Sequence, residues 1–331
     1  MKFDSSFLAM ESWLIRVPKK RGEETRQKLI ELGVIDKNLK IRSETDDILI
    51  PVIKQVAGFN IEKGDFELLK KEESTKEILG YSPAFEQIGD IAIIERHEPD
   101  AQKVAEALLR NNKIKTVLYA ETPISGEYRT RGVTILAGEK KTRTLYRENG
   151  CRYLLDIACV YFTPRLSTER MRIAGQVKKF NKVVDMFAGA GPFSILIGKK
   201  VPDAHVIAID KNPDAVYYLK ENVKLNKVKN VEIKEGDARE IAKDIAGADH
   251  VIMNLPHSGL EFLDSALGMI RKGGIIHFYA MAHEDDLFDG ILSSIKEIAG
   301  NAGLQVNPLD KRIVRPYAPY QYNICIDLQV I

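Results

Sequence analysis

Hydrophobic runs alternate with helix-length segments throughout the second half of the chain. From about Thr168, the predicted strands are residues 183–186, 205–210, 231–235, 250–254 and 274–280, with helices between them, for example 214–226 and 261–270. Residues 311–317 and 322–330 add two strands that suit an antiparallel pair. Strands that alternate with helices predict an α/β fold, here a doubly wound sheet with an edge hairpin.

The first part of the chain lacks that alternation and predicts a small α+β unit. A strand at 13–17 and a helix at 23–32 precede a strand at 48–53, in which Pro51 favours an edge position. Charges balance in residues 1–75 and no catalytic cluster stands out, so we expect an accessory or docking domain. The polar, charged stretch 70–76 is typical of a linker.

A second small α+β unit is expected after this linker. It has strands at 89–94 and 115–119, a helix at 101–110 and a loop at 126–131. Two alternating runs, 142–147 and 153–158, flank Asn149-Gly150, which is a strong hairpin signal. Arginines alternate along this hairpin and should share one face, as a phosphate-contacting surface requires. We therefore expect three domains, at 1–75, 76–168 and 169–331.

Composition limits the classes of protein that fit. The chain has 331 residues, 29% of them charged and 44% hydrophobic, as in a soluble globular protein. No apolar run approaches the roughly 20 residues of a membrane helix, and the N-terminus lacks a signal-peptide pattern. Cys151, Cys159 and Cys325 are scattered and lack metal-ligand spacing. We expect free thiols in a reducing cytoplasm, and no metal.

The charge is unevenly distributed. Residues 110–182 carry 16 Lys/Arg against 6 Asp/Glu, although the whole chain is only +2. A short charged cluster is usually just a solvated face. A whole region this basic is better explained by a polyanionic partner, and nucleic acid is the natural candidate.

One glycine turn carries the first chemical signal. A short apolar run ends on Asp185, the chain turns through Gly189 and Gly191, and an apolar helical segment follows. Such a turn lets backbone N–H groups approach a ligand closely. Ser194 occupies the place of the third glycine of a dinucleotide fingerprint. The Asp-x-Phe-x-Gly-x-Gly form instead resembles the first motif of class I methyltransferases, which bind S-adenosylmethionine (AdoMet).

Further polar residues follow at the ends of the next three strands. Asp210 can accept both ribose hydroxyls, or it can be the N-cap of the next helix. Asp237 can accept a hydrogen bond from the adenine amino group, or it is a surface loop acid. Asn254 begins an Asn-Leu-Pro element related to the Asn/Asp-Pro-Pro-aromatic motif of amino-methylating enzymes, from which Leu255 and His257 depart. His257 is either a base or an ordinary loop histidine. Together the four signals predict AdoMet binding.

Nearly the whole chain resembles the archaeal and eukaryotic tRNA guanine N1-methyltransferases that modify the purine 3′ of the anticodon, position 37. The matching segments are 126–131, 136–139, 147–150, 156–162, 164–170, 184–193, 254–256 and 317–319. The resemblance implies tRNA as the partner, with the N-terminal domain at its outer corner and the basic domain at the anticodon stem and loop. We expect a cytoplasmic protein from its cysteines, and a monomer without an obligate protein partner because nothing in the sequence indicates a larger assembly.

The resemblance also implies roles for individual residues. Guanine N1 carries a proton at neutral pH, and Glu169 matches the general base that removes it; a helix N-terminal acid is the alternative. Arg129 would stabilise the charge that develops on O6, with phosphate binding as the alternative. Asn254 is the third catalytic candidate, because the related motif of amino-methylating enzymes accepts the hydrogens of the amine. Residues expected to contact the cofactor, of which Tyr161 can equally be a core aromatic, are Tyr161, Arg165, Arg170, Asp185, Phe187, Gly189, Gly191, Pro192, Asp210, Lys211, Asp237, Ala238, Asn254 and Pro256.

Three rival functions share parts of this pattern. The aminocarboxypropyl transferase of the wybutosine pathway has the same fold and cofactor, but it lacks the residues at Asn254 and Arg165. A methyltransferase branch that also acts on the tricyclic wybutosine intermediate departs at the first motif and at Asn-Leu-Pro. A non-catalytic tRNA-binding protein would not need Glu169, Arg129 and Asn254.

Overall fold

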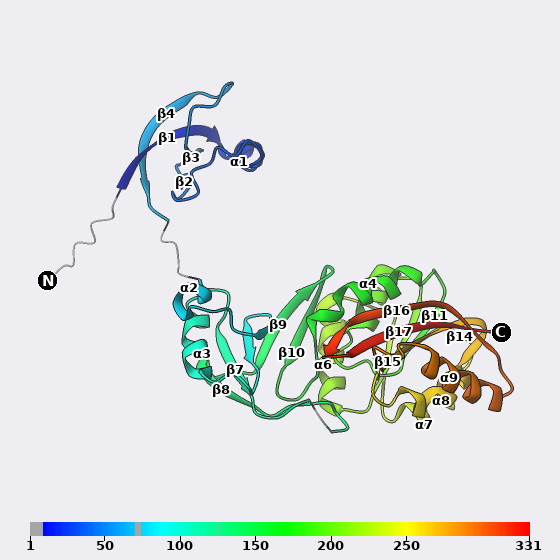
Figure 1. Ribbon diagram of the computed structural model, residues 1–331. Coiled ribbons are helices and arrows are strands. Elements are labelled where there is room, and N and C mark those ends of the chain that lie inside the picture. Colours follow the sequence, from blue (N-terminus) through cyan, green and yellow to red (C-terminus); the bar gives the residue numbers. More distant parts are fainter. Residues whose placement is uncertain (1–8, 70–73, 125) are drawn as a thin grey trace. The chain divides into compact units, whose positions relative to one another are not determined.

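The computed structural model describes residues 9–69, 74–124 and 126–331. Two compact units make up the chain, Met1–Ser74 and Thr75–Ile331 (Figure 1). No helix within the described residues is long and apolar enough to cross a membrane.

The first unit is an antiparallel sheet with one α-helix. Its strands, in the spatial order β2-β3-β1-β4, are β1 (Ala9–Pro18), β2 (Arg42–Ser43), β3 (Asp47–Val52) and β4 (Ile61–Glu67). Helix α1 (Gly22–Glu31), preceded by the 3-10 turn η1 (Lys19–Arg21), buries Leu29 against Ile15 and Ile50. Ordinary amphipathic packing accounts for this unit.

The predicted edge position of Pro51 is wrong. Strand β3 lies between β1 and β2. Proline is tolerated there because β2 is only two residues long and pairs with Ile48 and Leu49, so no ladder hydrogen bond is lost at Pro51. The carbonyl of Pro51 accepts a bond from the Asp36 amide at 3.0 Å.

The second unit begins with a four-stranded mixed sheet of order β5-β6-β7-β8. Its elements are α2 (Thr75–Leu79), β5 (Phe85–Ile88), β6 (Ile91–Ile94), α3 (Ala101–Leu109), β7 (Thr116–Ala120) and β8 (Val133–Gly138). The strand predicted from 89 begins at Ile91, because Gly89, with φ 60°, turns the chain back from β5. Helix α3 covers one face through Val104 and Leu108.

The predicted Asn-Gly hairpin is confirmed. Strands β9 (Arg143–Glu148) and β10 (Cys151–Asp156) pair in antiparallel register around Asn149 and Gly150, whose φ angles are 48° and 73°. Two positive φ values in the central residues are what a type I′ turn requires. Along the hairpin Tyr153 and Leu155 are buried, while Arg143, Arg147 and Arg152 are exposed.

The second half of the chain forms the expected doubly wound sheet. Its seven strands have the order β13-β12-β11-β14-β15-β17-β16, and the first five are parallel. The terminal strands are an antiparallel pair, as predicted, with β17 inserted beside β15. The strands are β11 (Lys182–Asp185), β12 (His205–Asp210), β13 (Val231–Glu235), β14 (Ala248–Met253), β15 (Ile270–His283), β16 (Val306–Ala318) and β17 (Gln321–Val330).

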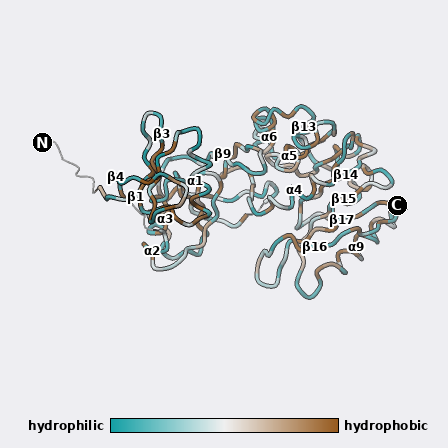
Figure 2. Tube along the Cα trace, turned by 90° about the horizontal axis from the view of Figure 1, so that it is seen from above, coloured by the Kyte–Doolittle hydropathy of each residue, from teal (hydrophilic) through white to brown (hydrophobic). Residues whose placement is uncertain are grey.

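Helices cover both faces of this sheet, so hydrophobic positions concentrate on the strands and hydrophilic ones on loops and outer helix turns (Figure 2). One face packs against α4 (Ser167–Gln176), α5 (Pro192–Lys200) and α6 (Pro213–Asn226), with the 3-10 turn η2 (Pro164–Leu166) before α4. The other face packs against α7 (Ala238–Ala242), α8 (Leu263–Met269) and α9 (Asp289–Asn301), with η3 (Gly259–Phe262) before α8.

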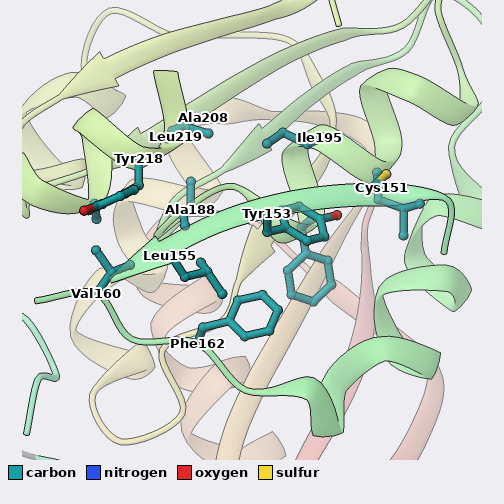
Figure 3. Packing of buried hydrophobic residues seen from close by; sticks show 14 of the residues in the cluster. Cys151, Tyr153, Leu155, Val160, Phe162, Ala188, Ile195, Ala208, Tyr218 and Leu219 are labelled. Atoms are coloured by element: carbon teal, nitrogen blue, oxygen red, sulfur yellow. The ribbon is translucent and has the colours of Figure 1, made fainter. Parts of the chain in front are cut away.

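The β9–β10 hairpin shares the first of these cores. Tyr153 and Leu155 belong to one buried cluster with Phe162, Ile195 and Leu219 (Figure 3). The four-stranded sheet contributes its second face to the same cluster. A boundary at 168/169 would run through helix α4 and this core, so the division of residues 76–331 into two domains stays a prediction.

Candidate functional site

A cavity of about 380 Å³ opens at the carboxyl ends of the parallel strands. This volume lies within the range of small-molecule sites. Asp210 ends β12, Asp237 follows β13 and Asn254 follows β14, and all three line the cavity. The crevice beyond the strand ends is where open α/β sheets bind ligands. The structure thus brings together residues that are far apart in the sequence.

Asp210 is held by the glycine turn of the first motif. Its Oδ2 accepts the amide of Gly189 at 2.6 Å, and its Oδ1 accepts the amide of Asn212 at 2.9 Å. Burial raises the pKa of Asp210, and these amide bonds act against the rise. The alternative of Asp210 as a helix cap is wrong, because the cap of α6 is Asn212. Each carboxylate oxygen of Asp210 keeps a lone pair for a ligand.

Two residues of the same turn do not line the cavity. Gly191, with φ 88°, closes the turn, and a Cβ there would overlap Leu219 and lie 2.9 Å from Ile195 Cδ1. Asp185 is fully buried and accepts the Ser194 hydroxyl at 2.6 Å. Burial raises the pKa of Asp185 to about 7. These two residues build the turn, whereas Gly189 faces the cavity.

Asp237 and Lys211 are polar residues at the rim of the cavity. Asp237 caps α7 by accepting the Arg239 amide at 2.9 Å, and its side chain pairs with Arg239 Nη2 at 3.1 Å. The hydrogen bond from Arg239 lowers the pKa of Asp237 to about 2. Lys211 Nζ lies 3.5 Å from Asp237 Oδ2 and 2.5 Å from Glu127 Oε1, which ties the 126–131 segment to this rim. Asp237 is therefore a helix cap as well as a cavity residue.

Apolar side chains form the walls between these groups. Phe187 meets Phe262 edge to face at 5.0 Å, and Pro192, Ala238 and Pro256 also line the cavity. Tyr161 lines it as well and is half-buried. An apolar lining with a few convergent polar groups is typical of small-molecule and cofactor sites.

Basic and aromatic side chains form another part of the cavity lining. Arg129 lies over the Tyr161 ring at 5.7 Å from its centroid and has φ 52°, which is unusual for a residue with a side chain. His257 contacts Tyr317 edge to face at 5.7 Å. Burial, and then the charge of Arg129, lower the pKa of His257, which favours the neutral ring. Arg129, His257 and Asn254 all line the cavity.

Helix α4 places its predicted site residues differently. Arg170 lines the cavity, but it is buried, binds Glu148 Oε1 at 2.6 Å and stacks on Phe162 at 4.8 Å. Glu169 is buried behind the wall, where Arg172 and the Tyr279 hydroxyl bind its carboxylate. Arg165 is outside the wall; it is largely exposed, with Nε 3.7 Å from Glu86 Oε1. The structure therefore does not place Glu169 or Arg165 at the cavity surface.

Some residues of the wall carry no signal in the sequence. Arg315 and Asn323 come from the terminal hairpin and line the cavity. Within the described residues, Arg315 Nε and Asn323 Oδ1 are buried without a hydrogen-bond partner. Buried polar atoms normally have a partner, so unpaired ones in a cavity wall suit a polar ligand. The matching segment 317–319 lies between them in the sequence, but it does not include either residue.

The cavity fits the expected cofactor. It offers a two-oxygen carboxylate for ribose hydroxyls at Asp210, an acceptor at Asp237 and an apolar slot between Phe187 and Pro192. Among the described residues, no group of three or more His, Cys, Asp or Glu is placed to hold a metal. Cys151, Cys159 and Cys325 are free thiols.

Three family models match the chain in sequence. The TRM5/TYW2 methyltransferase domain matches residues 144–307. The tRNA methyltransferase 5 N-terminal domain matches residues 15–60, and the TYW2 N-terminal domain matches residues 66–142.

Curated relatives match over most of their length. The tRNA (guanine(37)-N(1))-methyltransferase Trm5b of Pyrococcus abyssi is 44% identical over 96% of this chain and 98% of its own. The tRNA(Phe) (4-demethylwyosine(37)-C(7)) aminocarboxypropyltransferase of Methanocaldococcus jannaschii is 35% identical over 73% of this chain and 96% of its own.

Solved structures agree with the fold. A complex of an archaeal-type Trm5 with tRNALeu superimposes with a TM-score of 0.70 at 32% identity, covering 96% of this chain and 99% of that one. M. jannaschii Trm5 in complex with adenosine gives 0.66 at 34% identity, with the same coverage. M. jannaschii TYW2 in complex with AdoMet gives 0.59 at 29% identity, over 75% of this chain and 99% of that one. The predicted fold class and AdoMet cofactor are confirmed at the level of the family. The chain belongs to the TRM5/TYW2 methyltransferase family.

Proposed function

We propose that this protein transfers a methyl group from AdoMet to N1 of the guanosine at position 37 of tRNA, in the cytoplasm and as a monomer. The observation that carries the proposal is a cavity that gathers two chemically different sets of groups. Asp210 and Asp237 offer acceptors for a nucleoside, and Arg129, Asn254 and His257 offer groups that can act on a base. The likeness to Trm5b over nearly the whole chain supports the same activity.

One set of residues would bind AdoMet and orient it. Asp210 would accept hydrogen bonds from the ribose hydroxyls, and Asp237 would accept one from the adenine amino group. Phe187 and Pro192 would enclose the adenine ring, and the close backbone at Gly189 leaves room for the ligand. Bound AdoMet supplies an electrophilic methyl group on its sulfonium. The protein then needs only to align the acceptor and remove its proton.

A second set of residues would remove the guanine N1 proton and stabilise the negative charge on O6. Loss of the N1 proton pushes negative charge onto O6, and Arg129 with the Asn254 amide would stabilise it. Glu169 would be the general base. For this role the Glu169 carboxylate would have to leave Arg172 and the Tyr279 hydroxyl and turn into the cavity that Arg170 lines. His257 is the rival base, since it already faces the cavity.

The hairpin offers a surface for the RNA backbone. Arg147 and Arg152 are directly opposite each other across β9 and β10, and both are exposed. Like charges in facing positions destabilise a sheet, unless an anion binds between them. Phosphates of the anticodon stem and loop would provide that anion. The first unit would contact the outer corner of the tRNA, as its match to the Trm5 N-terminal domain suggests.

The rival activity is aminocarboxypropyl transfer, which the M. jannaschii relative carries out. That relative covers only 73% of this chain, whereas the match to the Trm5 N-terminal domain favours the methyltransferase.

The deciding assay uses unmodified tRNA transcripts that carry guanosine or adenosine at position 37. The protein is incubated with AdoMet, and the products are digested and analysed by mass spectrometry. We expect 1-methylguanosine at position 37 with the first transcript and no product with the second. No product with the first transcript, as expected of an enzyme that acts only on a 4-demethylwyosine at position 37, or a methyl group at another position would refute the proposal.

A further inference from the structure

A buried cluster of charges lies behind the cavity wall, where two carboxylates share one guanidinium. Arg172 Nε lies 2.9 Å from Glu169 Oε2, and its Nη2 lies 2.6 Å from Glu169 Oε1. The same guanidinium binds Asp327 on β17, through Nη1 to Oδ2 and through Nη2 to Oδ1 at 3.2 Å. Asp327 and Glu169 are almost fully buried, at 3% and 7% exposure.

Other side chains fix Asp327 in place. His277 Nδ1 on β15 donates to Asp327 Oδ1 at 2.7 Å, and Gln176 Nε2 donates to Oδ2 at 2.9 Å. Although burial acts to raise it, the hydrogen bonds from His277 and Arg172 hold the pKa of Asp327 well below its usual range. His250 on β14 stacks flat on His277, with its Nδ1 3.1 Å from His277 Nε2.

Glu169 has few other polar neighbours. The Tyr279 hydroxyl on β15 donates to Oε1 at 2.8 Å, and the Cys325 thiol on β17 lies 3.3 Å from Arg172 Nη2. Burial raises the pKa of both Tyr279 and Cys325, so these groups are neutral at neutral pH. Arg172, Glu169 and Asp327 therefore form one ion-paired group here, and the His277 ring lies against Asp327.

The ion pair with Arg172 would by itself hinder Glu169 as a base. A buried carboxylate bound by an arginine of its own is a poor proton acceptor, because the cation favours the charged form. Protonation or departure of Glu169 would also leave Arg172 buried without a counter-ion, which is costly. Asp327 removes both obstacles, because it stays bound to Arg172 through both terminal nitrogens when Glu169 is protonated or turns away.

We propose that Asp327 is a positioning residue for the methyl transfer, which neutralises Arg172 and so leaves Glu169 free to accept the guanine proton. The inference rests on the proposed role of Glu169 as base. The proposal predicts the direction in which the proton affinity of Glu169 changes. Removal of Asp327 makes Glu169 a weaker proton acceptor, and removal of Arg172 makes it a stronger one. A purely structural role would not move the two variants in opposite directions.

The test measures the titration of Glu169 directly. The full chain is labelled with ¹³C at the glutamate carboxyl carbons, and the signal that Glu169→Gln removes identifies Glu169. Its midpoint is then followed in Asp327→Asn, Arg172→Met and the double variant, beside the pH profile of single-turnover methylation. Asp203→Asn, an exposed aspartate paired only with Lys179 in the described structure, is the matched control.

We expect the midpoint to fall by about one pH unit in Asp327→Asn and to rise by about one unit in Arg172→Met, with the double variant between them and Asp203→Asn unchanged. The acid limb of the rate profile should move with the midpoint, and the plateau rate of Asp327→Asn should fall. Should Asp327→Asn not fold, the double variant against Arg172→Met still shows the effect of Asp327, as a lower midpoint. Losing both partners of a buried pair is better tolerated than losing one.

Two outcomes would overturn the inference, and only the second would also overturn Glu169 as the base. Midpoints that stay within error of the wild type in every variant overturn it alone, and Glu169 can still be the base. Midpoints that move while the rate profile does not follow overturn Glu169 as the base, and with it the role of Asp327 in the reaction.

Discussion

The amide of Gly189 donates a 2.6 Å hydrogen bond to Oδ2 of Asp210, so the turn after β11 fixes the carboxylate at the end of β12. This bond links the carboxyl ends of two neighbouring parallel strands, β11 and β12. The bond orients Asp210 toward the cavity and leaves each of its oxygens able to accept one more hydrogen bond.

Asp210→Ala should therefore weaken AdoMet binding and leave tRNA binding unchanged. Loss of hydrogen bonds to a charged group costs about 1.5–3 kcal/mol, which corresponds to roughly a 10- to 100-fold weaker affinity. Isothermal titration calorimetry measures it, with Asp214→Ala on the neighbouring helix as control. Equal AdoMet affinity in Asp210→Ala and the wild type would show that Asp210 does not bind the ribose.

The identity of the base can be decided between two residues. Glu169→Gln should retain AdoMet and tRNA affinity and lose about 10²- to 10⁴-fold in the single-turnover rate, because the amide cannot take up the proton. His257→Gln should lose far less. Rapid-quench kinetics with saturating enzyme measures both variants. The reverse ranking would assign the proton to His257.

The hairpin surface is tested by charge reversal. Arg147→Glu should weaken tRNA binding at least tenfold and reduce the slope of log affinity against log salt by about one unit, because one phosphate contact is lost. AdoMet affinity should not change. Lys296→Glu, on the exposed side of α9, is the matched charge reversal. Similar losses in the two variants would indicate a general charge effect without a specific contact.

Two glycines with similar φ angles allow the cost of overpacking to be distinguished from the cost of backbone strain. Gly191→Ala should lower the free energy of unfolding by about 2–4 kcal/mol, because it adds overpacking against Leu219 and Ile195 to the strain of a positive φ. Gly247→Ala, with φ 72° and nothing within 4 Å of the new methyl group, should cost only about 1 kcal/mol. Urea unfolding measures both. Equal losses would mean that the backbone angle alone requires Gly191.

The His250–His277 pair should make stability depend on pH. Burial lowers the pKa of His250 to about 4, against about 6.5 in an unfolded chain. Between these values the unfolded state binds the extra proton, so His250 costs stability as the pH falls from 6.5 toward 4. From pH 7.5 to pH 5 the wild type should lose about 2 kcal/mol more than His250→Gln.

The comparison with the variant is needed because Asp185 acts in the opposite sense. Its folded-state pKa of about 7 lies above its unfolded value, so Asp185 contributes stability as the pH falls from 7. Urea unfolding at both pH values gives the difference between wild type and variant. A difference that does not change with pH would mean that His250 is protonated in the fold.

The strand ends were predictable from the sequence because they depend on local order. A predicted strand followed by a polar residue recurs at Asp210, Asp237 and Asn254, and the carboxyl ends of parallel strands meet at one edge. The glycine turn is equally local. Its two glycines look alike in sequence, however, and only packing shows that Gly189 faces the cavity while Gly191 contacts Leu219.

Two predictions depended on partners that the sequence pattern does not name. Pro51 suggested an edge strand, but the extent of its neighbour β2 determines whether a proline is tolerated there. Glu169 matched a family motif, yet its carboxylate is bound by Arg172 and Tyr279 behind the cavity wall. A motif describes residue types along a segment, and it does not describe what packs against them.

The sequence by itself determined the fold class, the cofactor turn and the acids at the strand ends, because periodicity and strand-end chemistry are carried by neighbouring residues. Only the tertiary structure decided that Arg315 and Asn323 complete the cavity and that Asp327 shares Arg172 with Glu169 across a separation of 155 residues. Strand β17 inserts beside β15 in the sheet, and this insertion brings those side chains to the site. No local pattern records it, because the contacts form only when the sheet is complete.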